Sequence, residues 1–581
     1  MCKLVRPSIE KPWLKFFSDE AREASMPKNT IYRHLRENNE NRRSDTALNY
    51  FGRKISYGTL LDEADRCAGA FKAAGIGKGD IVAAATVTIP EMVYALYGLN
   101  KIGAAPLVID PRTSASGVMD FIKESGAKIF IVIDLFYDAL KDAIFESGVE
   151  KIVVISADTS LPSSIRFLKQ FKMPAPKIAT SDKVLTWTQF SATGEGIKTE
   201  TVEYGENDLA AVTLTGGTTG APKGVMLSND GFNAIAFDFK HCGVSYDRGQ
   251  RFLNIIPMFS SYGIVSSLHM PLSLGLEVVV IPKFDADKVG YYVKKYRPEH
   301  TLLVPAHYEK LMNSKEMAKG FNLSFFRTAG SGGDTMNAGL EAKLNKFLES
   351  RGCRFPLSQG YGMSEVSSAA SCCCNGNFKS LSVGYPLLTT NIAIFEPGTQ
   401  KELDYGEEGE ICISGPSIML GYLNNKAETD KVMRRHDDGT VWVHSGDIGH
   451  MDSDGFVYIK GRIKRMITLF NGHKIFPTHI ESVLGRHSGV SSCAVVGVND
   501  TQHAQGQLTL AVIETKETSL EKRTAIKNEL YEMCRQELEG SAKPYDIIFV
   551  DSMPHTGMGK IDYLKLADDY NNENKEETEA V

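Results

Sequence analysis

The chain has 581 residues, of which 42% are hydrophobic and 23% are charged, and this length predicts at least two domains. Its formal net charge of −6 offers no basic field for nucleic acid, and no apolar stretch approaches the length of a membrane span. We therefore expect no nucleic-acid partner and no integral association with a membrane. The ten cysteines include no C-x-x-C pair, which argues against a zinc or thioredoxin-like site and favours a reducing, cytoplasmic location.

Charged residues interrupt the first seventeen positions, so this segment lacks the apolar core of a signal peptide. Two interpretations of its apolar residues are open, a face that touches a membrane or a segment that docks on the body of the protein. The residues concerned are Trp13, Leu14, Phe16 and Phe17. Docking is the interpretation that we favour.

The first third of the chain alternates between strand and helix patterns. Residues 57–74 carry an apolar stripe at helical spacing and end before Gly75, which suits a left-handed C-cap. Pro90 suits the first turn of a second helix, which Gly103 ends. The strands expected around these helices are 54–56, 81–87, 105–109, 128–133 and 151–155. Strands separated by helices predict a parallel sheet covered on both faces.

The pattern changes further along the chain. Residues 157–182 contain three prolines and no clear period, so we expect a surface excursion there. From 409 to 459 short strands alternate with turns, and residues 452–455 predict a hairpin turn rather than a calcium loop. Past Gly461 we expect strands at 492–498 and 508–514, a helix at 520–537, and an acidic, disordered end.

These patterns predict an α/β fold with three parts. A large N-terminal domain, residues 1–463, is expected to hold parallel sheets layered with helices plus a small β-barrel-like portion. A small α+β C-terminal domain is expected over residues 464–570, and the disordered tail over 571–581.

The most informative segment reads Thr-Leu-Thr-Gly-Gly-Thr-Thr-Gly-Ala-Pro-Lys-Gly-Val from position 213 to 225. Glycines let backbone N–H groups converge on an anion, hydroxyl groups donate to it, and a lysine adds a mobile positive charge. The residues with these three properties are Gly216, Gly217 and Gly220, then Thr215, Thr218 and Thr219, then Lys223. The segment is no Walker A loop, because Pro222 precedes the lysine and Gly224 follows it. We interpret it as a phosphate grip; the alternative is a Gly/Thr-rich turn without a ligand.

At this segment the sequence resembles the acyl-adenylate-forming (AMP-binding) superfamily of acyl-CoA synthetases, luciferases and peptide-synthetase adenylation domains. Residues 215–224 match its phosphate loop, [ST]-[SG]-G-[ST]-T-G-x-P-K-G. Four further elements resemble the superfamily in the same order, at 359–365, 409–422, 444–462 and 554–561. The resemblance covers about residues 55–562 and is closest in character to acyl-CoA synthetases and fatty-acid–CoA ligases.

The resemblance implies ATP, Mg²⁺ and CoA as ligands. Glu365 would bind Mg²⁺, a hard cation that prefers carboxylate and phosphate oxygens. Ser364 would contact the α-phosphate, while Thr215 and Lys223 would act from the phosphate loop. Lys560 would lie between the α-phosphate and the acyl carboxylate, where charge builds up during adenylation.

The resemblance also assigns the nucleoside and the moving parts. Asp447 would accept hydrogen bonds from the ribose hydroxyls, and Arg462 would donate to the ribose or phosphate region. The adenine pocket would be formed by Ser331, Gly332, Gly333, Gln359, Gly360, Tyr361, Gly362 and Met363, with Tyr361 stacking on the base. The C-terminal domain would be a mobile lid that rotates about Lys464, and Gly472 would face the thiol tunnel. A plain solvated linker is the alternative for the basic residues around Lys464.

Residues 257–263 resemble the element that many acyl- and aryl-CoA synthetases write as P-[LM]-[FY]-H, here with Ser260 in place of the histidine. Ser260 and Tyr262 are therefore expected at the acyl pocket. The lack of an aspartate at this position argues against an α-amino acid, whose buried ammonium group would need a counter-charge. The small residues 366–374 fit either an open channel for a long apolar tail or a tightly packed strand.

The expected reaction is ATP-dependent activation of a small-molecule carboxylic acid, fatty or otherwise non-amino, to its acyl-AMP with release of pyrophosphate. Transfer to CoA would then give acyl-CoA and AMP. The sequence leaves two alternatives open, an adenylation enzyme that loads an acyl carrier protein and a non-catalytic nucleotide-binding relative.

Overall fold

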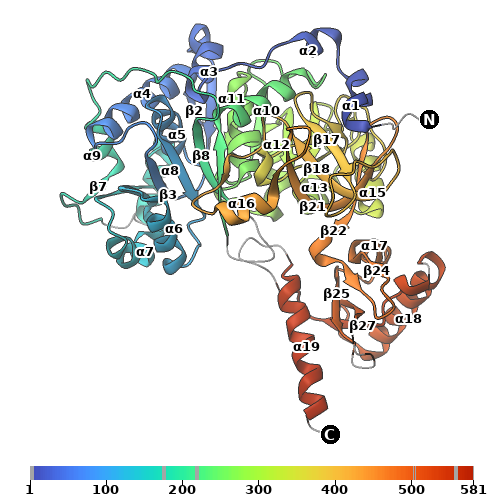
Figure 1. Ribbon diagram of the computed structural model, residues 1–581. Coiled ribbons are helices and arrows are strands. Elements are labelled where there is room, and N and C mark those ends of the chain that lie inside the picture. The colour runs from blue at the N-terminus through green and yellow to red at the C-terminus, as the bar shows by residue number, and fades with distance from the viewer. Residues whose placement is uncertain are drawn as a thin grey trace.

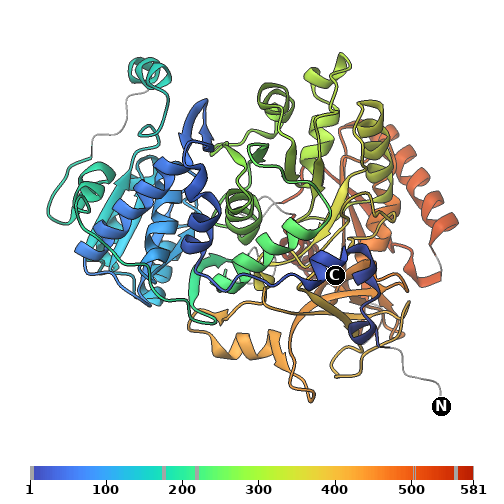
Figure 2. The ribbon, with the colours of Figure 1, turned by 90° about the horizontal axis from the view of Figure 1, so that it is seen from above.

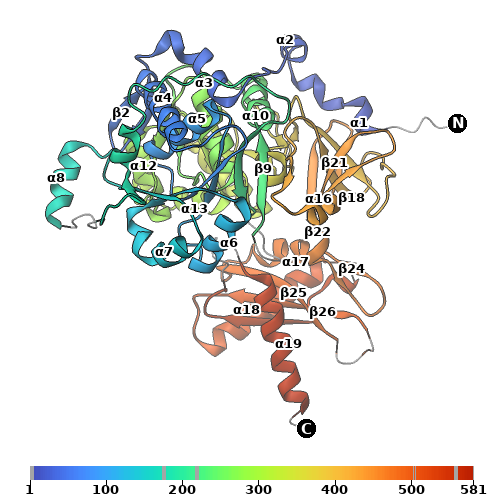
Figure 3. The same ribbon diagram turned by 60° about the vertical axis from the view of Figure 1, so that its left-hand side comes forward.

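The computed structural model describes residues 6–172, 178–215, 222–500, 503, 505–538, 540–554 and 561–579. Two helix-covered sheets and a smaller open sheet form a large body, and the C-terminal part lies below this body in the view of Figure 1. The two are joined through β22 (Val457–Arg462). Figure 3 shows the same separation from the side.

The first sheet has eight strands in the order β19-β9-β8-β4-β3-β5-β6-β7. Their bounds are β3 (Ile81–Ala85), β4 (Ala105–Ile109), β5 (Ile129–Ile133), β6 (Lys151–Ile155), β7 (Val184–Thr186), β8 (Leu209–Leu214), β9 (Gly224–Ser228) and β19 (Gly421–Tyr422). From β8 to β7 all neighbours run parallel. Alternate strand residues enter two different apolar cores, as Ile131 and Val132 illustrate, so the sheet is covered on both faces.

The second sheet has nine strands in the order β16-β15-β14-β13-β12-β10-β11-β1-β2. Their bounds are β1 (Thr46–Tyr50), β2 (Arg53–Ser56), β10 (Arg251–Asn254), β11 (Glu277–Val280), β12 (His300–Leu303), β13 (Thr328–Ser331), β14 (Ser358–Tyr361), β15 (Ser371–Cys372) and β16 (Tyr385–Pro386). The strands from β1 through β14 on this path are parallel. The carboxyl ends of β13 and β14 therefore meet at one edge.

Local chemistry accounts for the predicted helices. In α4, the Ser56 side chain accepts from the Thr59 N–H at the start, and Gly75 follows the end at φ +81°. Pro90 opens α5 as expected. The longer described α-helices of the body are α3 (Ile31–Asn39), α4 (Tyr57–Ala73), α5 (Pro90–Lys101), α6 (Ala115–Ser125), α7 (Asp134–Glu146), α8 (Ser163–Lys172), α10 (Asn229–His241), α12 (Val289–Tyr296), α13 (Pro305–Met312) and α15 (Ala338–Ser350).

The expected barrel-like portion is an open sheet, and this part of the prediction is wrong. Its strands are β17 (Asn391–Phe395), β18 (Gly409–Ser414), β20 (Met433–Arg435), β21 (Val441–Met451) and β22. β21 pairs with β18, β20 and β22, and in the described chain the edge strands β17 and β20 do not pair with each other. A barrel requires that pairing. The hairpin between β21 and β22 turns at Asp452–Gly455 as predicted, with Gly455 at φ +94°.

The C-terminal part has a three-stranded sheet of β25 (Ser492–Asn499), β26 (Gln507–Glu514) and β27 (Asp546–Val550). Its helices are α17 (Pro477–Leu484), α18 (Leu520–Glu537) and α19 (Tyr563–Glu579), and a short hairpin joins β23 (Ile467–Thr468) to β24 (Lys474–Ile475). The structure continues α19 through 571–579, where the acidic composition predicts disorder. Leu566, only 3% exposed, anchors the start of this helix, and its later residues include good helix formers.

The N-terminal segment docks on the body, as favoured above. Trp13 is fully buried and Phe17 is 4% exposed. The Phe16 ring lies 4.5 Å from that of Tyr385. Within the described part of the chain, no helix is both long and apolar enough to cross a membrane.

Candidate active site

A buried carboxylate brings Tyr361 of β14 together with β21 and β22. The Tyr361 hydroxyl donates to Asp447 Oδ2 at 2.6 Å, and Arg462 Nε lies 2.9 Å from Asp447 Oδ1. Asp447 is 3% exposed, whereas half of the Arg462 side chain faces solvent. Burial and the adjacent carboxylate raise the pKa of Tyr361 well above its usual range, so this phenol remains a donor. We call these three residues the Asp447 cluster.

A chain of hydrogen bonds fixes the backbone that precedes Asp447. Glu410 on β18 accepts from His444 Nδ1 at 2.9 Å and from the Gly446 N–H at 3.1 Å. The His436 and His444 Nε2 atoms lie 3.1 Å apart. Burial works to raise the pKa of Glu410, but His444, the Gly446 N–H and the charge of Arg434 together hold that pKa below its ordinary value. The sequence motifs contain Glu410 and His444, but their role in fixing the turn before Asp447 appears only in the structure.

A second cluster joins Glu365 to Lys223, the lysine of the predicted phosphate loop. The Tyr422 hydroxyl donates to Glu365 Oε1 at 2.7 Å, and Lys223 Nζ lies 4.9 Å from the centre of the Tyr422 ring. Lys223 also pairs with Glu428, and hydrogen bonds from Lys223 and Lys431 lower the pKa of Glu428 to about 2. A polyphosphate that approaches Lys223 must therefore compete with Glu428. The sequence alone predicts no role for Tyr422 or Glu428.

The two ends of the predicted phosphate loop are hydrogen-bonded to each other. The Lys223 N–H donates to Thr215 Oγ1 at 3.0 Å, and the Thr215 N–H donates to the Lys223 carbonyl at 2.9 Å. The remaining predicted loop residues, Gly216, Gly217, Thr218, Thr219 and Gly220, lie outside the described residues.

Glu365 fits the role of a Mg²⁺ ligand. It is 8% exposed, lies in the short helical turn η5 (Ser364–Val366), and is oriented by the Tyr422 hydroxyl, which donates to Oε1. Beside the phosphates of a bound nucleotide, its carboxylate would supply the oxygen ligands that Mg²⁺ prefers.

The predicted adenine-pocket residues lie at the carboxyl ends of β13 and β14. Ser331 ends β13, and Gly333, at φ +80°, is close to the Tyr262 ring. A Cβ on Gly362 would lie 1.8 Å from the Ser368 carbonyl oxygen, so this position requires glycine. Gln359 and Gly360 belong to β14, Gly332 follows β13, and Met363 precedes η5.

The expected acyl-pocket residues lie at the start of the π-helical segment η3 (Tyr262–His269), with Ser260 just before it and Tyr262 as its first residue. The Ser260 hydroxyl donates to the Pro257 carbonyl at 2.9 Å and accepts from the Gly263 N–H at 3.1 Å. This hydroxyl is therefore engaged with the local backbone. Ser261, the next residue, has its Oγ 3.4 Å from Ser364 Oγ.

The segment after Glu365 is tightly packed. Ser367 is fully buried, and the Ser368 and Ser266 hydroxyl oxygens lie 2.6 Å apart, which joins the segment to η3. The sequence left open whether these small residues line an open channel or pack tightly, and the structure shows the packed arrangement.

The hinge and tunnel candidates lie in the C-terminal part. Lys464 is exposed in the short turn η6 (Ile463–Arg465), and the adjacent Arg465 pairs with Glu481 of α17. Gly472 is exposed in the turn between β23 and β24, with φ +80° and open space where a Cβ would project. Lys560 lies outside the described residues.

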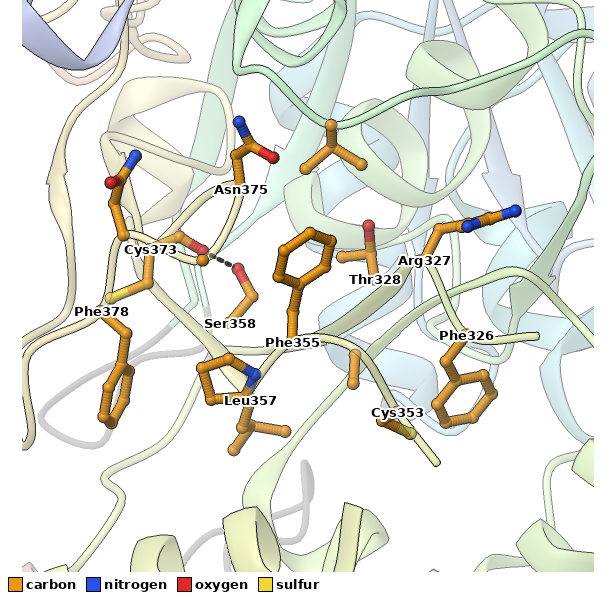
Figure 4. Close-up of a pocket in the computed structure, with 15 residues that line it drawn as sticks. Phe326, Arg327, Thr328, Cys353, Phe355, Leu357, Ser358, Cys373, Asn375 and Phe378 are labelled. Atoms are coloured by element: carbon orange, nitrogen blue, oxygen red, sulfur yellow. Dashed lines mark hydrogen bonds between the residues drawn. The ribbon is translucent and has the colours of Figure 1, made fainter. Parts of the chain in front are cut away.

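A separate pocket lies at the opposite edge of the second sheet, at the amino ends of β13 and β14 (Figure 4). Phe326, Thr328, Cys353, Phe355 and Ser358 are among its lining residues. Since Ser331 and Tyr361 end the same two strands, this pocket is distinct from the clusters above.

Comparison with known proteins identifies the family of the chain. Residues 35–423 match the family model described as AMP-binding enzyme, and residues 479–560 match the AMP-binding enzyme C-terminal domain. A long-chain-fatty-acid–CoA ligase from Bacillus subtilis (strain 168) is 28% identical over 95% of this chain and 97% of its own length. 4-Coumarate–CoA ligase 2 from Nicotiana tabacum is 28% identical over 84% of this chain and 85% of its own.

Solved structures share the fold. ATP-bound MatB from Rhodopseudomonas palustris gives a TM-score of 0.78 at 23% identity, covering 94% of this chain and 99% of MatB. The Mycobacterium tuberculosis fatty acyl CoA synthetase gives a TM-score of 0.67 at 23% identity, covering 96% of this chain and 99% of its own. The family model matches more than half of the sequence. The chain therefore belongs to the AMP-binding enzyme family.

Proposed function

We propose that this enzyme is an AMP-forming acid–thiol ligase whose acid is a long-chain fatty acid and whose thiol is CoA. The observation that carries the enzyme class is the set of contacts around the nucleotide site. Lys223 and Glu365 share Tyr422, while Asp447 bonds to Tyr361, four positions before Glu365. These residues come from distant parts of the chain and belong to the motifs of the family.

The reaction follows from what these groups can do. The substrate carboxylate is ionised near neutral pH, so it attacks the α-phosphorus of ATP without a general base, and the bond to pyrophosphate breaks. Lys223 compensates phosphate charge, and Asp447 holds the ribose hydroxyls. The CoA thiol then attacks the acyl carbon, loses its proton to solvent, and AMP leaves.

Mg²⁺ would be held by Glu365, where the ion would neutralise phosphate charge. We infer that residues 464–570 act as a lid that turns about Lys464. Lys560 would reach the α-phosphate in the first step, and Gly472 would face the thiol tunnel in the second. The exposed position of Lys464 beside the anchored Arg465 supports this hinge.

The fatty acid is favoured over an amino acid or aryl acid by two observations. Ser260 offers no counter-charge for an ammonium group, since its neutral hydroxyl bonds to the local backbone. The relative matched over nearly its whole length is a long-chain-fatty-acid–CoA ligase, whereas 4-coumarate relatives cover less of the chain. The nine cysteines in the described residues are free thiols, which is typical of the cytoplasm, where we place the enzyme.

ATP–pyrophosphate exchange over a panel of acids tests this proposal. We expect exchange with palmitate to exceed that with octanoate, 4-coumarate, benzoate and leucine, and nucleotide analysis to find AMP rather than ADP. Thioester formation should occur with free CoA. The same assay with holo-acyl carrier protein in place of CoA tests whether the enzyme loads a carrier protein instead. If none of the acids supported exchange, the protein would be a non-catalytic relative. Formation of ADP instead of AMP would indicate acyl-phosphate chemistry.

Replacing Glu410 by alanine should raise the KM for ATP about tenfold with a smaller change in kcat. The variant removes the acceptor of both His444 Nδ1 and the Gly446 N–H, and hydrogen bonds to a charged group contribute about 1.5–3 kcal/mol. Initial-rate kinetics measure the two constants, and thermal unfolding reports any general loss of stability. Glu410→Gln keeps one carbonyl acceptor, so its KM for ATP should lie between those of the unmodified enzyme and Glu410→Ala. A fall in kcat with an unchanged KM would contradict this positioning role.

A further inference from the structure

Glu428 is a charged residue beside Lys223 that takes part in no step of the proposed reaction. It lies in α16 (Lys426–Val432), which Figure 1 labels at the edge of the large body and Figure 2 shows from above as the orange helix at the lower edge. Its carboxylate pairs with Nζ of Lys223 and with Nζ of Lys431. The side chains of Lys223 and Glu428 are 32% and 30% exposed, so a charged ligand can reach their contact from solvent.

Hydrogen bonds fix the backbone of Glu428 relative to Lys223. The Asn425 side chain accepts from the Glu428 N–H at 3.1 Å and caps the first turn of α16. Thr429 Oγ1, from the next position, accepts from the Tyr422 N–H at 2.9 Å. Tyr422 belongs to β19, which pairs with β9, the strand that begins directly after Lys223. The helix that carries Glu428 is therefore tied to the strand beside Lys223, so the opposition of the two side chains is built into the fold.

The contacts of the two clusters follow one order from the ribose end of the site to the phosphate end. Asp447 accepts from Tyr361 at the end where we place the ribose. Glu365, four positions after Tyr361, accepts from the Tyr422 hydroxyl. The Tyr422 ring lies 4.9 Å from Lys223 Nζ. Lys223 is thus the residue of this series farthest from Asp447, and we expect it to meet the phosphates of ATP that lie farthest from the ribose.

The Glu428 carboxylate and a polyphosphate would compete for the same ammonium group. Both are anions, so they also repel each other when the ligand approaches Lys223. Lys431, whose side chain is 69% exposed, pairs with the same carboxylate. It can remain there when Lys223 turns to a phosphate, so the exchange leaves Glu428 with a cationic partner.

We propose that Glu428 is a specificity-determining residue for the phosphate chain of the ligand. It pairs with Lys223 until a polyphosphate binds, releases the lysine to ATP, and pairs with it again when pyrophosphate leaves. AMP and acyl-AMP lack the two distant phosphates, so they leave the pair intact. Glu428 thereby weakens the binding of ATP and pyrophosphate without weakening that of AMP, which favours departure of pyrophosphate after adenylation. This inference rests on the proposed AMP-forming reaction, in which pyrophosphate is the first product.

Replacing the carboxylate by its amide tests the proposal, because the size of the side chain is kept and its charge is removed. In calorimetric titrations of the full chain with Mg²⁺ present, Glu428→Gln should bind ATP and inorganic pyrophosphate at least about threefold more tightly, the scale of a partly exposed ion pair. AMP should bind with unchanged affinity. Loss of a merely structural side chain would weaken all three ligands, so a gain confined to the polyphosphates reports the competition.

Asp430→Asn is the matched control. Asp430 lies in the same helix, is 59% exposed, and pairs with Lys426 at 2.7 Å. Its replacement changes the net charge of α16 by the same amount without removing a partner of Lys223. The variant should therefore bind ATP, pyrophosphate and AMP like the unmodified protein.

Lys223→Met separates this inference from the proposed reaction. It should weaken the binding of ATP and pyrophosphate, and in this background the gain from Glu428→Gln should shrink, because only direct repulsion remains to be relieved. If Lys223→Met weakened ATP binding but Glu428→Gln failed to strengthen it, the competition would be refuted while the proposed reaction stood. An equal gain in Asp430→Asn, or for AMP, would also overturn it. If Lys223→Met left ATP binding unchanged, the phosphate role of Lys223 would be wrong and the inference would fall with it.

Discussion

Replacing Lys560 by alanine should slow acyl-adenylate formation by about 10²–10³, while thioester formation from supplied acyl-AMP and CoA remains near the unmodified rate. The reason is the position of the charge build-up. Negative charge gathers at the α-phosphate when the acyl carboxylate attacks it, and a lysine ammonium stabilises that transition state. No such meeting of anions occurs when the thiol displaces AMP. Lys560 is the last residue of the matched C-terminal domain, so we expect it to act only when that domain covers the nucleotide site.

Single-turnover assays of the two half-reactions, run separately, measure this difference. Lys560→Arg keeps a positive charge and should recover part of the first step, which separates loss of charge from loss of fold. Equal losses in both steps for Lys560→Ala would exclude the alternation of domains and leave a fixed site or a folding defect.

Gly472 offers the opposite test. Gly472→Trp should block the thiol's path and slow thioester formation while adenylation is preserved. Gly472→Ala is the matched control, because it carries the same strain at φ +80° without the bulk, and open space surrounds the position of its Cβ. If alanine and tryptophan slow the second step equally, backbone strain rather than the tunnel explains the effect.

Replacing Asp447 by alanine should weaken ATP binding at least about 100-fold. Two ribose hydroxyls would lose a charged acceptor, and each such hydrogen bond contributes about 1.5–3 kcal/mol. The variant also leaves the buried Tyr361 hydroxyl and the guanidinium of Arg462 without their common partner. Asp447→Asn keeps one carbonyl acceptor and should show a smaller loss.

Calorimetric titration with ATP measures this affinity. Tyr361→Phe removes only the hydroxyl that donates to Asp447 and serves as the control for disturbance of the cluster itself. Its affinity should fall far less than that of Asp447→Ala. Unchanged affinity in Asp447→Ala would reduce this carboxylate to a structural residue of β21.

The sequence by itself determined the local elements and the order of the motifs. The apolar stripe and caps of α4 span a few turns of one helix, and the apolar strands β4 and β6 begin and end where their composition predicts. The same holds for the turn at Asp452–Gly455. These features depend on neighbouring residues, and local propensity and spacing report on neighbours.

Only the tertiary structure decided which distant residues meet. Tyr422 bonds to Glu365 across 57 positions and Tyr361 to Asp447 across 86, while Lys223 reaches Glu428 across 205. The same is true of the open sheet around β21 and of the burial of Trp13, for which the sequence favoured docking but left two interpretations open. Such contacts depend on how sheets and helices pack against one another. Periodicity within a segment of ten or twenty residues carries no information about that packing.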